Sequence, residues 1–182
     1  MDDIVKAAMA KWPNVPNCYG WLGLDARGRW YMRDDKTQAA GPFAGPGAQT
    51  ASLGSLLTHD KLIAFIHRNY GVDGQGCWYF QNGPQRVYVE LAATPWVWRV
   101  GPGAKVESHT GLEVVVESTW LDDDGVLYLH TDRGLGLVHT LDMAAAADLV
   151  DAGVWDPLPC TAAELPERFG YKKSPLLNQR AF

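Results

Sequence analysis

One nine-residue pattern occurs three times in this chain and constrains its fold more than any other feature. Its copies occupy residues 24–32, 72–80 and 121–129. Each copy reads apolar-Asp-x-x-Gly-x-(Trp or Leu)-Tyr-apolar, and the copies start 48 and 49 residues apart, from 24 to 72 and from 72 to 121. A fixed period of this size is typical of a structural unit that is used repeatedly.

Each copy predicts the tip of a β-hairpin and its outgoing strand. An aspartate at the start of a tight turn accepts hydrogen bonds from the backbone just beyond it, and the glycine supplies the positive φ that closes the loop. The apolar and aromatic residues that follow suit a half-buried strand. The alternative is common turn chemistry met three times by chance, but the shared tyrosine and near-equal spacing favour a repeat. We therefore assign the Asp and Gly residues to turns and not to catalysis.

The remaining patterns predict separate helices and strands. A helix is expected over 2–11, another between an N-cap at Thr58 and a C-cap at Gly71, and a third from an N-cap at Asp142 to Asp151 with Gly153 as C-cap. The form Thr161-x-x-Glu164 predicts a capping box for a short fourth helix. Further strands are expected over 19–24, 29–33, 87–91, 96–100, 112–118 and 135–139. Residues 34–56 are expected to form a long loop, and the tail over 171–182 to be extended.

These elements predict an α+β fold with mainly antiparallel sheets built from repeated β-hairpin/helix units. Two subdomains are expected. Residues 1–83 hold the first two hairpins and the main helix, and residues 84–182 hold the third hairpin, the second helix and the tail. Packing of both as one compact unit is the alternative.

Composition excludes several classes of function. The formal net charge is -5, and no run of like charge reaches five residues, so we expect no nucleic-acid partner. No apolar run approaches the ~18 residues that span a bilayer, and the first six residues are not those of a signal peptide. The cysteines, Cys18, Cys77 and Cys160, form no Cys-x-x-Cys pair, which argues against a zinc site or disulfide framework. A cytoplasmic location is the simplest expectation.

No recognised catalytic or cofactor motif is present, so we predict no catalytic residue, cofactor or metal. Residues 122–124 imitate the start of a calcium loop but lack its final glutamate. A nucleophilic pair between Cys18 or Cys77 and a histidine is conceivable. Buried free cysteines that act as small apolar residues are the simpler interpretation.

Tryptophans and neighbouring arginines give the best candidate site. The chain has eight tryptophans, and alternation along a strand places Trp96 and Trp98 on one face. Arginines above an aromatic floor would bind an anionic or aromatic ligand. The polar segment over 81–86 interrupts the repeat and is the loop where we would look first. The candidate ligand-binding residues are Trp30, Arg33, Asn82, Gln85, Arg86, Trp96 and Trp98. Tryptophans in the core, covered by arginine stems, are the alternative.

The order of elements resembles the proteobacterial domain-of-unknown-function family 1285. The stretches that carry the resemblance cover about two-thirds of the chain and are Gly28–Trp30, Asp60–Tyr70, Asp73–Phe80, Val87–Pro95 and Gly125–Thr131. The segment 34–56 and the tail depart from that family. Residues 17–22 and 80–89 are similar to phrases of a narrower group of uncharacterised bacterial proteins. The resemblance implies a small α+β fold in two subdomains and a ligand-binding or signalling role. It supplies no enzymatic activity and no catalytic residue.

The leading hypothesis is a non-enzymatic cytoplasmic module that binds a small anionic or aromatic ligand or a protein partner, with a signalling role. One alternative is a small hydrolase or transferase that uses a Cys/His or Asp/His site. A second alternative is a subunit whose exposed aromatic strands pair in a homodimer.

Overall fold

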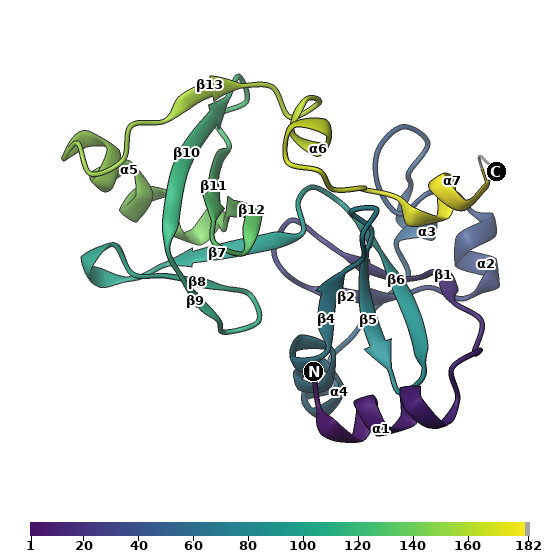
Figure 1. Cartoon of the computed structure of the whole chain (residues 1–182). Helices are drawn as coiled ribbons and strands as arrows, with labels where there is room; N and C mark the ends of the chain where they lie inside the picture. Colours follow the sequence, from purple (N-terminus) through teal and green to yellow (C-terminus); the bar gives the residue numbers. More distant parts are fainter. Residues whose placement is uncertain (181–182) are drawn as a thin grey trace. The chain divides into compact units, whose positions relative to one another are not determined.

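The computed structural model describes residues 1–180 and shows an α+β fold that divides into two compact units (Figure 1). Unit 1 comprises Met1–Asp25, Arg29–Ala92 and the C-terminal segment from Tyr171. Unit 2 comprises Ala26–Gly28 and Ala93–Gly170. Each unit has its own sheet. No helix within residues 1–180 is both long and apolar enough to cross a membrane.

The sheet of unit 1 has the strand order β3-β2-β1-β6-β5-β4. Its strands are β1 (Cys18–Leu24), β2 (Trp30–Met32), β3 (Ser55–Leu56), β4 (Tyr70–Val72), β5 (Trp78–Asn82) and β6 (Gln85–Leu91). Neighbours pair antiparallel except β1 and β6, which are parallel. The helices of this unit are α1 (Asp3–Lys11), α2 (Asp35–Ala39), α3 (Thr50–Leu53), α4 (Asp60–Arg68) and α7 (Pro175–Arg180).

The sheet of unit 2 has the order β13-β10-β11-β12-β7-β8-β9. Its strands are β7 (Trp96–Val100), β8 (Val106–Ser108), β9 (Glu113–Val114), β10 (Val116–Asp122), β11 (Leu127–Thr131), β12 (Gly134–Val138) and β13 (Leu158–Cys160). The β7–β12 and β10–β13 pairs are parallel, and the others are antiparallel. The helices are α5 (Met143–Asp151), α6 (Leu165–Arg168) and the short 3-10 turns η1 (Pro102–Ala104) and η2 (Thr140–Asp142). The predicted α+β class with mainly antiparallel sheets is confirmed.

The three copies of the sequence pattern form hairpins with the same register. In each copy, the residue just before the aspartate pairs with the residue five positions after that aspartate: Leu24 with Trp30, Val72 with Trp78 and Leu121 with Leu127. The turn glycines, at positions 28, 76 and 125, have φ of 75°, 79° and 76°. This left-handed backbone is costly for residues with a Cβ atom. The predicted hairpins are therefore present in all three copies.

The turn aspartates act as predicted through their carboxylates. Asp73 accepts backbone N–H groups of Gln75 and Cys77, both at 2.9 Å. Asp122 accepts the corresponding N–H groups, of Asp124 at 3.1 Å and Val126 at 2.8 Å. The second oxygen of each carboxylate accepts a tyrosine hydroxyl, from Tyr88 or Tyr128. These aspartates are structural, which agrees with their assignment to turns.

The division of the chain differs from the boundary expected at residue 83. That position lies in the turn between β5 and β6, and pairs such as Tyr79 with Tyr88 hold both strands in one sheet. The C-terminal segment also returns to unit 1, where Lys172 N–H donates to Gly76 O and Leu91 N–H donates to Lys173 O. Sheet pairing thus places residues 84–92 and the C-terminal segment with the N-terminal half.

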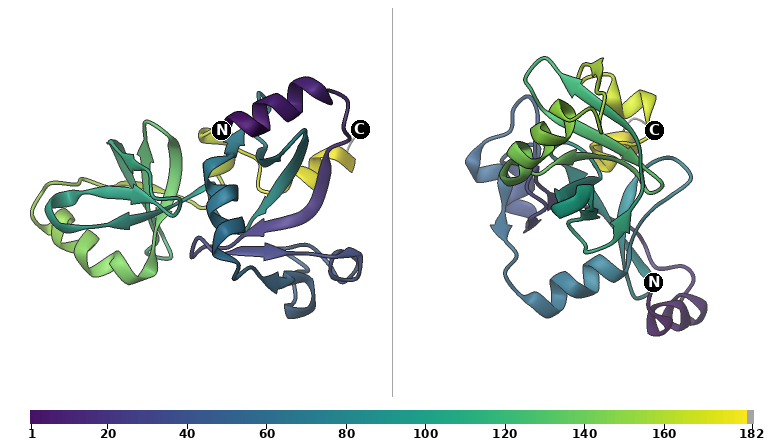
Figure 2. Two further views of the ribbon diagram at one scale, coloured as in Figure 1. Left: turned by 90° about the horizontal axis from the view of Figure 1, so that it is seen from below. Right: turned by 90° about the vertical axis from the view of Figure 1, so that its left-hand side faces the viewer.

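Helix α4 lies beside the start of α1 in unit 1, as Figures 1 and 2 show. Asp2 accepts the Arg68 guanidinium at 3.2 Å, and its backbone N–H donates to Asn69 Oδ1 at 2.9 Å. The observed N-cap of α4 is His59 and its C-cap is Asn69, so the predicted caps Thr58 and Gly71 were wrong. His59 Nδ1 accepts Leu62 N–H, so His59 caps the helix and Thr58 does not.

The segment 34–56 is not simply a loop, because it contains α2, α3 and β3. Asp34 caps α2 by accepting the N–H and hydroxyl of Thr37. Phe43 packs on Gly23 of β1, where a Cβ atom would lie 2.5 Å from the ring. The aspartate cap stabilises α2, and the buried Phe43 ring holds this segment against the sheet.

Two expectations at the C-terminal end were also wrong. Helix α6 has Glu164 as its N-cap, without a side-chain bond, so Thr161 forms no capping box. The tail includes α7 and is not extended throughout; its last two residues, 181 and 182, lie outside the described residues. Ser174 precedes Pro175, and a serine before a proline is a typical helix start.

Candidate functional site

The three tryptophans of the predicted site are core residues. The indole N–H groups of Trp30, Trp96 and Trp98 donate to His67 Nε2, Arg133 O and Leu129 O at 2.9, 2.8 and 2.9 Å. All three side chains are buried. Trp96 and Trp98 stack at 5.7 Å and cross Gly136 of β12, where a Cβ atom would lie 2.6 Å from Trp96 Cβ. Their arrangement matches the core interpretation of the sequence.

The polar residues of the 81–86 segment are dispersed along the β5–β6 hairpin. Arg86 lies over the Tyr79 ring at 4.6 Å, and Gln85 donates its amide N–H to Pro16 O at 2.9 Å. Asn82 ends β5 and is exposed. These residues belong to unit 1, whereas Trp96 and Trp98 belong to unit 2.

Arg33 is the predicted site residue that lines a large pocket. Its guanidinium donates three hydrogen bonds to backbone carbonyls, from Nε to Ser52 O, Nη1 to Gly20 O and Nη2 to Gly41 O, at 2.9, 3.1 and 2.7 Å. These bonds join the end of β2 to β1, to the 41–46 loop and to α3. The side chain is only 2% exposed. Arg33 therefore organises the pocket wall as well as lining it.

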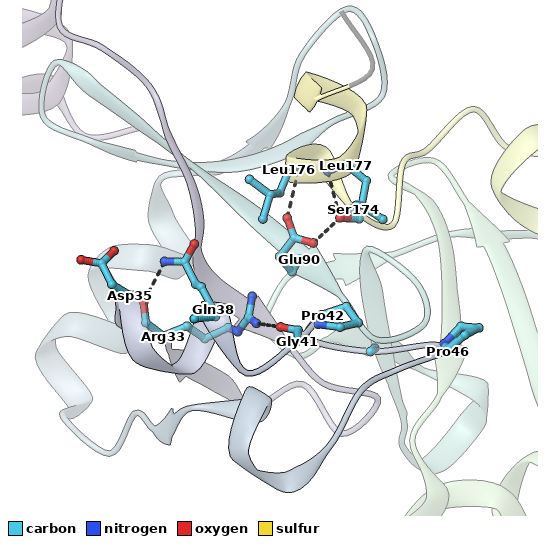
Figure 3. A pocket seen from close by; sticks show the side chains of 12 residues that line it. Arg33, Asp35, Gln38, Gly41, Pro42, Pro46, Glu90, Ser174, Leu176 and Leu177 are labelled. Carbon is cyan, nitrogen blue, oxygen red and sulfur yellow. Dashed lines mark hydrogen bonds between the residues drawn. The ribbon is translucent and has the colours of Figure 1, made fainter.

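The pocket, which we call the polar pocket, lies within unit 1 and has a volume of about 740 Å³. Figure 3 shows its lining, with Gln38 and Arg33 near one wall and Glu90, Ser174 and Leu176 near another. Helix α2 and the 41–46 loop form the first wall, and β6 and α7 form the second. Every lining residue belongs to unit 1: Arg33, Asp35, Gln38, Ala39, Gly41, Pro42, Ala44, Pro46, Glu90, Ser174, Leu176 and Leu177.

Glu90 is a buried carboxylate in this pocket, with 4% of its surface exposed. Ser174 Oγ–H donates to its Oε2, and Leu176 N–H donates to its Oε1 at 3.1 Å. Ser174 Oγ in turn accepts Leu177 N–H at 3.3 Å. Glu90 therefore fixes the start of α7 against β6, so one side chain both anchors the pocket wall and contributes its charge.

The electrostatics of the pocket rest on two buried charges of opposite sign. Burial lowers the pKa of the Arg33 guanidinium, and the nearby Glu90 carboxylate acts in the opposite direction. Arginine keeps its proton at neutral pH even so. A buried charge is costly unless other groups compensate it, and here three carbonyls and a carboxylate do so. The exposed carboxylate of Asp35 adds a negative charge at the rim.

Sequence reasoning missed Glu90, Ser174 and Gln38. Glu90 interrupts the apolar run of β6, and an acidic residue in a buried strand was a usable signal. Gln38 Nε2 donates to Arg33 O at 3.4 Å from α2, a helix within the segment expected to be a loop. Ser174 lies in the tail, 84 residues from Glu90, and no local pattern indicates that contact.

The histidines have structural contacts. His67 accepts the Trp30 indole N–H, and His139 Nδ1 accepts Leu141 N–H at 3.1 Å. His109 Nδ1 accepts Val97 N–H at 3.3 Å, and His130 Nδ1 lies 3.2 Å from Glu117. Cys77 and Cys160 are buried, and Cys18 is partly exposed. Among residues 1–180, no three His, Cys, Asp or Glu side chains are placed to hold a metal ion.

Comparison with known families extends these findings. The family model DUF2944, described as "Protein of unknown function (DUF2946)", matches residues 1–176. The chain belongs to this family. No curated protein matches it.

The chain is also similar to two solved structures. A DUF1285 family protein from Shewanella baltica OS155 is 16% identical, with 70% of this chain and 91% of that chain covered and a TM-score of 0.47. A DUF1285 family protein from Silicibacter pomeroyi DSS-3 is 13% identical, with 75% and 73% covered and a TM-score of 0.49. Both of these structures belong to the family 1285 that the sequence resembles.

Proposed function

We propose that the protein is a binding module for a small polar metabolite, and that the polar pocket of unit 1 holds this ligand. The observation that carries the proposal is the pair Arg33 and Glu90. Two almost fully buried charges of opposite sign line one pocket of about 740 Å³. Ligand sites are typically concave and have a few well-placed polar groups.

Arg33 is suited to bind a carboxylate. A guanidinium has five N–H groups in a planar fork, and three of them donate to the backbone carbonyls of described residues. Those bonds hold the fork in one orientation, which lowers the entropy lost when a ligand binds. The lining residues carry no aromatic side chain. Of the anionic and aromatic ligands expected from the sequence, we therefore propose the anionic class.

The acidic side of the pocket selects a second group on the ligand. Glu90 and Asp35 are both carboxylates, so they attract an ammonium group or a hydroxyl donor. The side chains of Leu176 and Leu177 give the α7 wall an apolar part. The class of ligand that fits these three features is a small amino acid or hydroxy acid.

A thermal-shift screen of amino acids and hydroxy acids tests this proposal. We expect a compound that raises the melting temperature of the wild-type chain. Its effect should be lost in Glu90→Gln and reduced in Arg33→Lys, since lysine keeps the charge but not the fork. Arg99→Lys is the matched control, because Arg99 pairs with Asp142 in unit 2. A compound whose shift survives both pocket substitutions would place the ligand elsewhere.

A signalling role is a further part of the proposal. Glu90 lines the pocket and also holds α7 by accepting hydrogen bonds from Ser174 and Leu176. A ligand that binds Glu90 therefore changes the contacts that hold α7. Limited proteolysis with and without ligand tests this role, with protection or release of the α7 segment as the expected change. Unaltered cleavage would argue against it. We also propose a cytoplasmic location, which the three free cysteines support.

A further inference from the structure

A second pocket, which we call the apolar pocket, lies between α4 and the sheet of unit 1. It has a volume of about 240 Å³. Leu62 and Ile66 of α4 form one wall, and Phe80 and Val87 of the sheet form another. Its other apolar lining residues are Trp21, Leu22 and Met32, and its two polar side chains are Cys18 and Asn82.

The apolar pocket and the polar pocket lie on opposite faces of one sheet. Side chains alternate between faces along a strand. In β6, Val87 lines the apolar pocket and Glu90 lines the polar pocket, three positions apart. At the end of β2, Met32 lines the apolar pocket and the next residue, Arg33, lines the polar one. The apolar pocket is therefore a separate site, and an inference about it does not rest on the proposed function.

The pocket lies beside an irregularity of the sheet. The parallel register of β1 against β6 shifts between Cys18 and Leu22. Three residues of this stretch, Cys18, Trp21 and Leu22, line the pocket. Irregular pairing of this kind re-aims side chains and occurs frequently beside binding sites. Here it accompanies a gap under α4 that side chains do not fill.

The rim of the pocket exposes large apolar surface. Trp21 is 40% exposed and Met32 is 45% exposed, although both line the pocket. Large apolar side chains that gather around a concavity indicate a site where a ligand covers them. A ligand here would remove this apolar surface from water, which favours binding.

We infer that the apolar pocket binds a small aromatic ring that carries one polar group. An apolar cavity of about 150 Å³ is enough to hold benzene. The pocket volume of about 240 Å³ therefore suits a ring of that size or a fused pair. Trp21 and Phe80 offer ring contacts, and the Met32 thioether makes favourable contacts with aromatic ligands. Asn82 at the edge provides an amide to pair with the polar group of the ligand.

Cys18 gives a direct readout of occupancy. It is the partly exposed cysteine, whereas Cys77 and Cys160 are buried, so a thiol reagent reports on Cys18 first. The probe is indole, and hexanol is the aliphatic comparison. At an indole concentration about ten times its dissociation constant we expect Cys18 to react about tenfold more slowly, because only the unoccupied fraction exposes the thiol.

Two variants and a direct measurement keep the test decisive. Leu62→Phe and Val87→Phe fill the pocket, and Leu141→Phe makes the same type of change at an exposed site of unit 2. Circular dichroism first confirms that each variant is folded. Saturation-transfer NMR should then show indole bound to the wild type and to Leu141→Phe but not to the filled variants. No indole signal with the wild type, an unchanged signal in a folded filled variant, or equal protection of Cys18 by hexanol would each overturn the inference.

Discussion

At the scale of single residues, the aspartates of the repeat are the clearest case of sequence dictating structure. Asp122 accepts two backbone N–H groups and the Tyr128 hydroxyl, all within one hairpin. Asp73 repeats the pattern with two N–H groups and Tyr88. A buried or half-buried carboxylate with three donors is stabilising, because each bond satisfies a group that has lost its water.

The first prediction concerns Asp122→Ala. We expect the free energy of unfolding to fall by about 3 kcal/mol, since three bonds to a charged acceptor are lost at once. Urea denaturation followed by circular dichroism measures the change. Asp123→Ala is the matched control in the same turn, and its exposed side chain predicts a change below about 0.5 kcal/mol. Equal losses in the two variants would show that the carboxylate of Asp122 is not what stabilises the hairpin.

The second prediction concerns pH and His67. Burial lowers the pKa of this imidazole below its ordinary value of 6.5. Its Nε2 accepts the Trp30 indole N–H, which only the neutral ring can do. The unfolded chain therefore binds the proton more tightly than the folded chain does. The stabilisation is complete above about pH 6.5 and is lost as the pH falls through the lower folded pKa.

Urea denaturation at pH 7.5 and pH 5 tests this prediction. We expect the wild type to be less stable at pH 5, and His67→Gln, which keeps an acceptor but does not titrate, to lose less stability over the same interval. If His67→Gln keeps the full pH dependence, His67 is not the group responsible.

At the scale of elements, α7 depends on a contact that is distant in sequence. Ser174 donates to Glu90 and accepts Leu177 N–H, so it both caps α7 and joins it to β6. For Ser174→Ala we expect amide hydrogen exchange at Leu176 and Leu177 to quicken about fivefold, which corresponds to about 1 kcal/mol for the loss of such a bond. Ser55→Ala in β3 is the control. Unchanged exchange in Ser174→Ala would mean that α7 is held by other contacts.

The elements also show how far sequence reasoning extends. The alternation in Trp96–Val100 predicted β7 with its observed ends, and the Asp-x-x-Gly pattern predicted three hairpins, because both signals are local. The order within 34–56 was missed, since it depends on Arg33 reaching three carbonyls and on Phe43 packing over Gly23. Of the residues that line the polar pocket, sequence reasoning predicted Arg33 alone as a site residue. Glu90 and Ser174 come together by folding, which spacing does not reveal.

At the scale of the whole molecule, the two units differ in how the chain builds them. Unit 2 is almost continuous, from Ala93 to Gly170, with only Ala26–Gly28 added. Unit 1 needs the C-terminal segment, because Lys172 forms a parallel β-bridge with Cys77 and Ser174 donates a hydrogen bond to Glu90. A fragment of unit 2 can therefore retain nearly all of its sheet, whereas a fragment ending at residue 92 lacks part of unit 1.

The fourth prediction follows from this difference. Residues 93–170 expressed alone should unfold cooperatively and give dispersed amide signals by NMR. Residues 1–92 expressed alone should be less stable than unit 1 of the full chain and should lose protection around Gly76 and Leu91, whose backbone groups bond to the C-terminal segment. An unfolded 93–170 fragment would show that unit 2 does not hold its fold by itself.

The central claim is that the polar pocket binds a small amino acid or hydroxy acid, and an amide NMR titration of the full chain with a panel of such acids tests it most directly. The account predicts saturable shift changes that concentrate at Gln38, Gly41, Glu90 and Leu176, which line the polar pocket together with Arg33. Glu90→Gln should remove these changes. Saturable changes that concentrate in unit 2 instead, or no saturable change with any acid of the panel, would contradict it.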